Sequence, residues 1–176
     1  DARRLGIEVL PPDINQSEFD FRVQDNGNGS NAVRFGLCAI KNVGDSAIEE
    51  VLRARSEHGP FANADRFCAQ VDLRKVGKRA LESLVKVGAM DSLAPRHHLL
   101  PAIEQLLGAS ASVHKAAEVG QATMFGMLSG DNEVANIDLQ PDAEEIPARQ
   151  LSSWEKELVG VYVSEHPLLS HIEEIE

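Results

Sequence analysis

The chain has 176 residues, of which 43% are hydrophobic and 26% are charged, and its formal net charge is −11. This composition is ordinary for a globular protein of one large or two small domains. No apolar run approaches the roughly 20 residues of a membrane span, and so acidic a chain is not expected to bind polyanions over its whole surface. The first residues, DARRLGIEVL, lack an initiator Met and the apolar region of a signal peptide, which indicates a piece of a longer protein.

The N-terminal part of the chain predicts a β-hairpin. Two short segments, FDFRV and AVRFGL, each alternate apolar and other residues, and the loop QDNGNGSN between them is rich in residues that tolerate turns. The apolar residues expected on the inner face are Phe19, Phe21, Val23, Val33, Phe35 and Leu37.

After Gly36 the periodicity becomes helical. One helix is expected from the Gly44-Asp45 cap to His58, a second after the Asn63 cap, and a third from Gly77 to Gly88. A single connecting helix is predicted over 96–117, in which Pro101 is tolerable only near the first turn.

The remaining chain divides into an arm and a helical end. Residues 118–150 have scattered Gly, Pro and acidic residues without a sustained period, which predicts an extended arm. Helices resume over 151–176, where Ser152 and Glu155 have the spacing of a capping box and Pro167 begins a final helix.

A repeat lies within the helical part. VGDSAIEEVL, from Val43, and VGKRALESLV, from Val76, share a Val-Gly turn and a similar short helix, 33 residues apart. Each copy has the order of a helix-hairpin-helix, in which a Gly lets the backbone approach a phosphate and the free amides and positive dipole of the next helix N-terminus bind it. The alternative is that Val-Gly only caps two packed helices.

Two copies with basic residues at both turns favour the phosphate-binding interpretation. Residues 1–95 hold 13 basic and 14 acidic residues, whereas residues 96–176 hold 4 and 14, so the two halves are expected to have different partners. The predicted DNA-binding residues are Lys41, Asn42, Val43, Gly44, Lys75, Val76, Gly77, Lys78 and Arg79. The predicted fold is mainly α: a tandem helix-hairpin-helix domain with a small N-terminal β-hairpin over 1–95, then the connecting helix, the arm and the C-terminal helices.

A second motif, GQATMFG, lies in the arm. Gln121, Met124 and Phe125 are similar to the bacterial sliding-clamp-binding peptide, in which the Gln amide fixes the entry and two adjacent apolar side chains fill a pocket. The alternative is a linker held against its own domain.

No catalytic or metal-binding pattern emerges. The six His residues have no metal-ligand spacing, and Cys38 and Cys68, which show no CxxC spacing, are expected to be buried thiols in a reducing cytosol. The chain itself is therefore not predicted to be an enzyme or to bind a cofactor.

The order of the motifs resembles the bacterial DNA polymerase III alpha subunit family. The segments that carry the resemblance are LPPDINQSEFDF, VRFGLCAIKNVGDSAIEEVLRAR, GPFANADRFCAQVD, KRALESLVKVGAMDSL, GQATMFG and WEKELVGVYVSEHPL. It implies a noncatalytic processivity region of a bacterial, cytoplasmic DNA-directed DNA polymerase. The partners it implies are double-stranded DNA, bound through its backbone, the sliding clamp and other replisome subunits, but no membrane. The catalytic aspartates and Mg²⁺ of the family belong to a palm domain outside this chain.

Three other hypotheses remain. The parent protein could be an error-prone alpha-type polymerase, which shares the hairpins but often has a poor clamp peptide. A helix-hairpin-helix DNA-repair enzyme would need a catalytic residue beside a base-flipping pocket, for which Lys86 or Asp91 are the candidates. A protein scaffold would account for the acidic second half.

Overall fold

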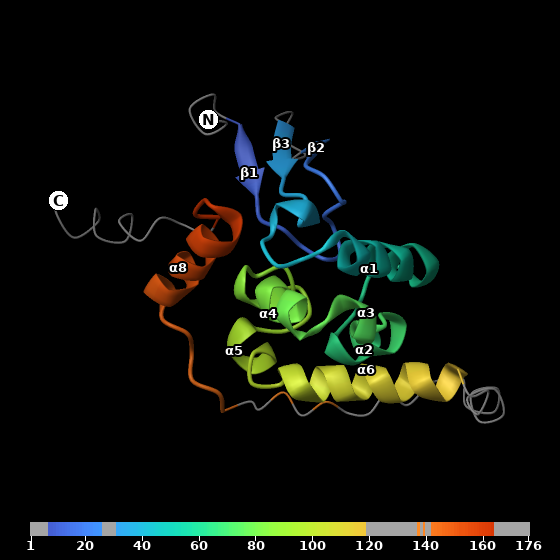
Figure 1. Cartoon of the computed structure of the whole chain (residues 1–176). Coiled ribbons are helices and arrows are strands. Elements are labelled where there is room, and N and C mark those ends of the chain that lie inside the picture. Colours follow the sequence, from blue (N-terminus) through green and yellow to red (C-terminus); the bar gives the residue numbers. More distant parts are fainter. Residues whose placement is uncertain (1–6, 26–30, 119–136, 138, 140–141, 164–176) are drawn as a thin grey trace.

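The computed structural model describes residues 7–25, 31–118, 137, 139 and 142–163, and this part of the chain is mainly α-helical, as the sequence predicts. In Figure 1 a small sheet lies at one end of a helical body, with α6 along the opposite side and α8 at the flank. The elements in chain order are β1 (Glu8–Leu10), β2 (Arg22–Asp25), β3 (Asn31–Arg34), the short helix η2 (Leu37–Ala39), α1 (Asp45–His58), α2 (Ala64–Gln70), α3 (Leu73–Val76), α4 (Lys78–Lys86), α5 (Arg96–Leu99), α6 (Ile103–Glu118) and α8 (Ala148–Val159).

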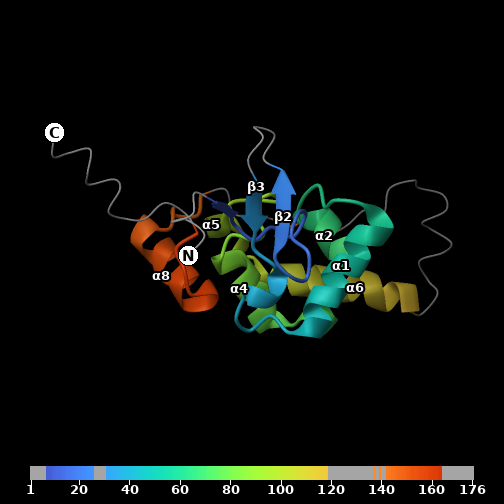
Figure 2. The same cartoon turned by 90° about the horizontal axis from the view of Figure 1, so that it is seen from above.

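The sheet has three strands in the order β1-β3-β2. The predicted hairpin is confirmed, because β2 and β3 pair antiparallel with Val23 opposite Val33. β1 adds a parallel partner on the other edge of β3, with Val9 opposite Val33. Seen from above in Figure 2, the sheet lies over the middle of the helical body, with α8 and the C-terminal end of α6 on opposite sides.

The predicted inner face of the hairpin is confirmed only in part, since Phe35 and Leu37 are buried in the core. Phe21 and Val23 are 52% and 63% exposed, whereas Ala32 and Arg34 of β3 are buried. Arg34 can be buried because all three of its guanidinium nitrogens donate hydrogen bonds, to Gln24, to the Pro11 carbonyl and to Gln16. Arg34 is therefore buried, although the alternation placed it on the face opposite to Val33 and Phe35.

The predicted helix ends are confirmed at several positions. Gly44 is the N-cap of α1, which ends at Gly59 with φ of 83°. Asn63 caps α2 by accepting a hydrogen bond from the Arg66 amide. Gly88 follows α4 with φ of 81°, a conformation that glycine adopts without strain.

Two helix predictions are wrong. The single helix expected over 96–117 is split by Pro101 into α5 and α6, since proline cannot donate the backbone hydrogen bond of a helix interior. α8 begins at Ala148 after Pro147, so Ser152 and Glu155 are buried inside the helix and do not form its capping box.

The remaining predictions have mixed outcomes. Cys68 is buried, which raises the pKa of its thiol to about 12, but Cys38 is exposed, contrary to expectation. The helix expected after Pro167 lies outside the described residues, as do Gln121, Met124 and Phe125. No helix in the described part of the chain has the length and apolar character needed to cross a membrane.

One mainly aliphatic core joins the helices. The largest fully buried side chains include Leu81, Leu84, Met90 and Leu106, and Phe67 adds an edge-to-face contact with Phe61, at 5.1 Å between ring centroids. Burial of such residues is the main source of folding free energy. Val43 and Val76, the valines of the two repeats, are therefore both part of this one core.

A buried serine fixes the corner between α2 and α3. Ser110 of α6 is fully buried, and its hydroxyl donates to the Val71 carbonyl (2.8 Å) and accepts from the Leu73 amide (3.0 Å). These two backbone groups lie between the helices, so Ser110 completes hydrogen bonds that no helix supplies.

We expect Ser110→Ala to lower the free energy of unfolding by about 1–3 kcal/mol, because it leaves two buried backbone groups unpaired. Urea unfolding followed by circular dichroism measures the change. Ser112→Ala is the matched control, since Ser112 is exposed on the same helix and bonds only to its own turn. Equal effects of the two substitutions would contradict this role for Ser110.

Candidate nucleic-acid interface

The first Val-Gly turn is a loop of irregular backbone between η2 and α1. Asn42 has φ of 67°, and it is the one non-glycine residue with positive φ in the described part of the chain. Val43 is buried in the core, and Gly44 is extended, with φ of −81° and ψ of 162°. The turn is thus anchored by its valine and presents Gly44 and the start of α1 at the surface.

The second Val-Gly turn has a different backbone from the first, although both follow the same residue pattern. Lys75 and Val76 are the last residues of α3, and Gly77 alone separates this helix from α4. In this turn the positive φ, of 82°, is at Gly77, whereas Lys75, which corresponds to Asn42 of the first turn, is helical. The two turns share a buried valine and a following glycine that caps the next helix.

Both turn glycines, Gly44 and Gly77, have empty space where a side chain would be. A Cβ atom added to Gly44 or Gly77 would meet no atom within 4 Å. Neither α1 nor α4 has a hydrogen bond from a capping side chain, and the first residues of both helices are exposed. Because the first amides of a helix have no intrahelical partner and lie at the positive end of its dipole, each turn can accept an anion.

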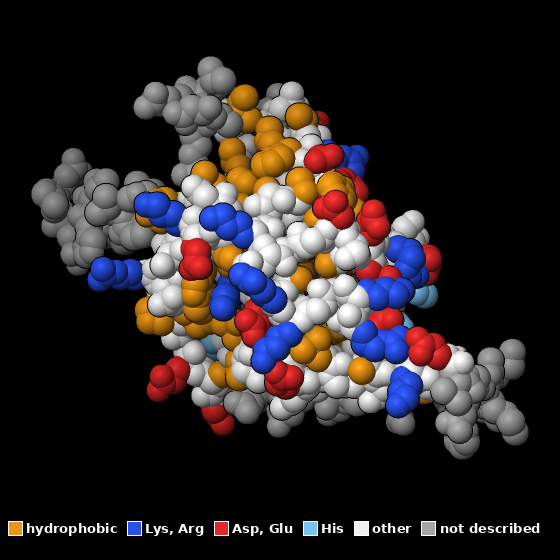
Figure 3. Space-filling view, viewed as in Figure 1, with side chains coloured by type: hydrophobic (Ala, Val, Ile, Leu, Met, Phe, Trp, Pro, Cys, Tyr) orange, Lys and Arg blue, Asp and Glu red, His pale blue; other side chains and the backbone are white. Residues whose placement is uncertain are grey.

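The cations around the turns fall into two groups. Lys75 pairs with the buried carboxylate of Glu50 at 3.1 Å, and Lys78 pairs with Glu104. Within the described residues, Lys41 and Arg79 have no ion-pair partner. Figure 3 shows Lys and Arg side chains over α4 and over α3 and α1 on this face, with acidic side chains among them.

Glu50 is the acid that organises this face. Its carboxylate accepts hydrogen bonds from Arg53, from the Asp72 amide and from Lys75, which links α1 to the start of α3. Burial alone would raise the pKa of Glu50, but these hydrogen bonds outweigh burial and lower its pKa to about 2. Lys75 therefore has a structural role, in its ion pair with Glu50, as well as a position near the second turn.

A cleft of about 220 Å³ lies where the first turn, α4 and α8 meet. It is lined by Asn42, Arg79, Glu82, Ser83, Lys86, Trp154, Glu157 and Leu158. The Lys86 ammonium lies 5.7 Å from the centre of the Trp154 ring, a cation–π contact between α4 and α8.

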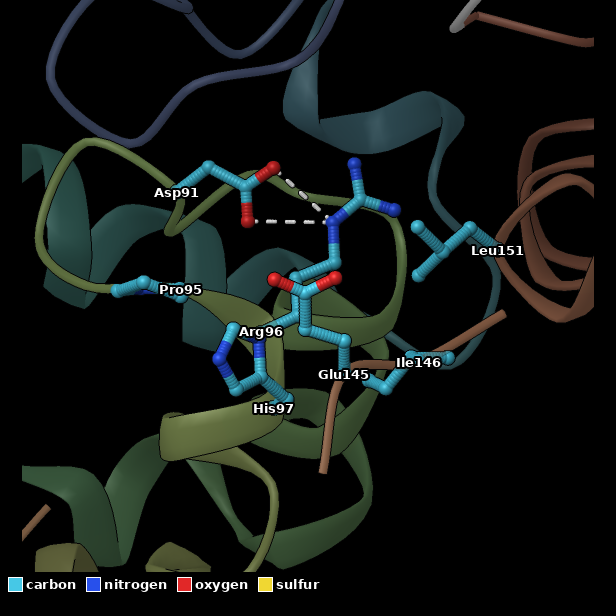
Figure 4. A pocket seen from close by; sticks show the side chains of 7 residues that line it. All are labelled: Asp91, Pro95, Arg96, His97, Glu145, Ile146 and Leu151. Atoms are coloured by element: carbon cyan, nitrogen blue, oxygen red, sulfur yellow. Dashed lines mark hydrogen bonds and ion pairs between the residues drawn. The ribbon is translucent and has the colours of Figure 1, made fainter. Parts of the chain in front are cut away.

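A second hollow, of about 340 Å³, lies between α5 and the segment before α8. Figure 4 shows Arg96 in this hollow with its Nε atom directed at both carboxylate oxygens of Asp91, at 3.1 and 3.0 Å. Lys86 and Asp91, the candidates for a repair enzyme, therefore line separate hollows. The described residues hold no group of three or more His, Cys, Asp or Glu side chains suited to a metal ion.

Sequence reasoning missed two residues of this face. Glu50 looks like one of many helical acids, and Ser83 interrupts the apolar run ALESLV in α4. Ser83 is nevertheless buried and accepts a hydrogen bond from the Asn42 side chain at 3.3 Å. The signal for Ser83 is its place on the inward side of α4, between Ala80 and Leu84.

Comparison with known proteins places this geometry in a family. Residues 6–100 match the family described as helix-hairpin-helix motif, so the chain belongs to the helix-hairpin-helix family. The whole chain is also similar to DNA polymerase III subunit alpha, which confirms the resemblance seen in the sequence.

Three relatives with that name show the extent of the similarity. The Vibrio cholerae protein is 36% identical over 176 residues, which cover 99% of this chain and 15% of the relative. The Thermus aquaticus protein is 39% identical over 173 residues (97% and 13%), and the protein of Escherichia coli K12 is 36% identical over 177 residues (98% and 15%). The chain thus spans about a seventh of the length of these relatives.

We expect Glu50→Gln to reduce the dependence of stability on acid. Because the folded pKa of Glu50 lies below its ordinary value of 4.5, its ionised form stabilises the fold above pH 4.5, and this contribution is lost as the pH falls toward 2. The variant should be less stable than the wild type by about 2 kcal/mol at pH 7 and by progressively less below pH 4.5. Thermal unfolding between pH 7 and pH 2.5 measures the difference. Glu49→Gln, at an exposed neighbour, is the control, and parallel curves for the wild type and Glu50→Gln would contradict the assignment.

Proposed function

We propose that this chain is a duplex-DNA-binding and sliding-clamp-binding region of a bacterial DNA polymerase III alpha subunit. In this proposal the N-termini of α1 and α4 bind phosphates of the DNA backbone, without contact to base edges. Backbone amides recognise phosphate and not sequence, so binding is independent of base order.

The observation that carries the proposal is the pair of uncapped helix N-termini, each following a glycine that opens onto free space. Gly77 needs its positive φ for the turn, whereas the extended backbone of Gly44 suits any residue. The fold therefore does not require a glycine at position 44. A glycine there would, however, allow a phosphate to approach the backbone closely. Lys41 and Arg79 add positive charge beside the turns.

The clamp-binding part of the proposal concerns Gln121, Met124 and Phe125. The segment that carries them follows Glu118, which is held by Arg74 at 2.6 Å, and precedes Ile137, whose amide donates to Asp65 at 3.0 Å. Phe125 is seven positions after Glu118 in the sequence, so the covalent chain allows it to lie at most roughly 25 Å from the end of α6. A clamp bound there would stay close to the DNA-binding domain.

The chemistry of the longer protein would belong elsewhere. We propose that this region does not polymerise and that the catalytic aspartates and their Mg²⁺ lie in parts of the polymerase outside this chain. The same proposal places the protein in the bacterial cytoplasm with other replisome subunits as partners.

We expect the chain to bind double-stranded DNA weakly, with log K falling against log salt at a slope of about −3 if it neutralises 3–4 phosphates. Gly44→Asp should reduce the affinity about tenfold or more, because the new carboxylate occupies the α1 amides and repels phosphate. The same carboxylate caps α1, so stability should stay equal or rise slightly. Fluorescence anisotropy with a labelled duplex at several salt concentrations, together with urea unfolding, measures both effects.

Asn63→Asp is the matched control, because it adds the same charge at the N-cap of α2 and keeps the capping hydrogen bond. It should bind duplex nearly as well as the wild type. Wild-type binding that does not depend on salt, or equal losses in both variants, would contradict phosphate binding at the first turn.

A further prediction concerns the clamp. Gln121→Ala combined with Phe125→Ala should abolish binding to a purified bacterial sliding clamp and leave the affinity for duplex DNA unchanged, since the proposed sites are separate. Surface plasmon resonance with immobilised clamp and with immobilised duplex measures the two affinities. Loss of both activities together would mean that the motif supports the fold and does not bind the clamp.

A further inference from the structure

The first turn is held in place by hydrogen bonds that come from outside it. The Asn42 side-chain nitrogen donates to the Ser83 hydroxyl of α4 at 3.3 Å, and the Lys41 amide donates to the Leu158 carbonyl of α8 at 2.8 Å. A turn that only capped α1 would need neither bond. The position of the α1 N-terminus therefore depends on α4 and α8.

The conformation of Asn42 indicates why a side chain is present there. A left-handed backbone is unfavourable for most residues but not for glycine, which would suit φ of 67° best. Asparagine tolerates the conformation and adds an amide that reaches Ser83. The hydrogen bond to α4 is thus what Asn42 supplies and glycine could not.

Ser83 is suited to receive this bond rigidly. It is 4% exposed and lies in the middle of α4, whose own N-terminus is the second proposed phosphate site. The Asn42–Ser83 bond consequently connects the two sites through a single short helix. A buried acceptor on a packed helix allows little independent movement of the turn.

α8 supports the turn from the other side. Glu155 of α8 is almost fully buried and accepts hydrogen bonds from the Val163 amide (2.9 Å) and from Arg96 (3.4 Å). Arg96 also donates to the Lys86 carbonyl at the end of α4 (3.1 Å), so α8 is tied to α4. The Leu158 carbonyl, which bonds to Lys41, is therefore part of the same rigid assembly.

We infer that Ser83 is a positioning residue for duplex binding. Through Asn42 it fixes the α1 N-terminus relative to the α4 N-terminus, so that both can bind phosphates of one duplex at the same time. Ser83 is buried and touches no DNA itself. Fixed spacing raises duplex affinity because the second phosphate contact forms without a further loss of conformational freedom. This inference rests on the proposed function.

The experiment measures duplex affinity at low salt for the wild type, Ser83→Ala, Asn42→Gly and the double variant. We expect each single substitution to weaken binding about threefold to tenfold, the size of one hydrogen bond. The double variant should bind no more weakly than the weaker single variant, because either change alone breaks the same connection.

Ser110→Ala is the matched control, since it also removes buried serine hydrogen bonds but Ser110 makes none with the first turn. Its affinity, corrected for the folded fraction, should stay within about twofold of the wild type. Ser83→Ala with wild-type affinity, additive losses in the double variant, or an equal loss in Ser110→Ala would overturn the positioning role while leaving the proposed function intact. A wild type that binds no duplex would overturn the proposed function and this inference with it.

Discussion

The structure depends on a pair of adjacent residues in each turn, a valine that is buried in the core and a glycine that lies at the surface. Val43 and Val76 are buried in the same aliphatic core, whereas the glycine after each begins a helix that no side chain caps. Core burial holds the helix N-termini in place, and the missing side chains leave their amides available. A surface of this kind is suited to bind anions through fixed helix dipoles, as proposed above, with little reorganisation.

The acidic composition of the chain is compatible with such a surface because several charges near the turns are paired within the fold. Glu50 engages Lys75 and Arg53, and Asp72 engages Arg74, so several cations of the basic run LRKVGKR also serve packing. Long-range attraction of DNA would therefore be modest, and binding would depend on the backbone amides with Lys41 and Arg79. A net charge computed over the whole chain hides this local arrangement.

The sequence predicted α1, α2 and α4 and their caps, because these follow from local rules. Gly44, Asn63 and Gly88 act where capping preferences place them. It did not predict the buried Arg34 or the inward Ser83 and Ser110, whose partners lie far away in the chain. Nor did it predict that the positive φ of the second turn lies at Gly77, two positions later than the corresponding Asn42 of the first turn.

The central claim is that phosphates of duplex DNA bind the free amides at the starts of α1 and α4. An NMR titration of the ¹⁵N-labelled protein with a short duplex at low salt tests it most directly. The account predicts that the amide signals of Asp45, Ser46, Lys78 and Arg79 shift most and return toward their free positions as salt is added. Unchanged signals at these four amides, with the main shifts in α6 or β2, would contradict it.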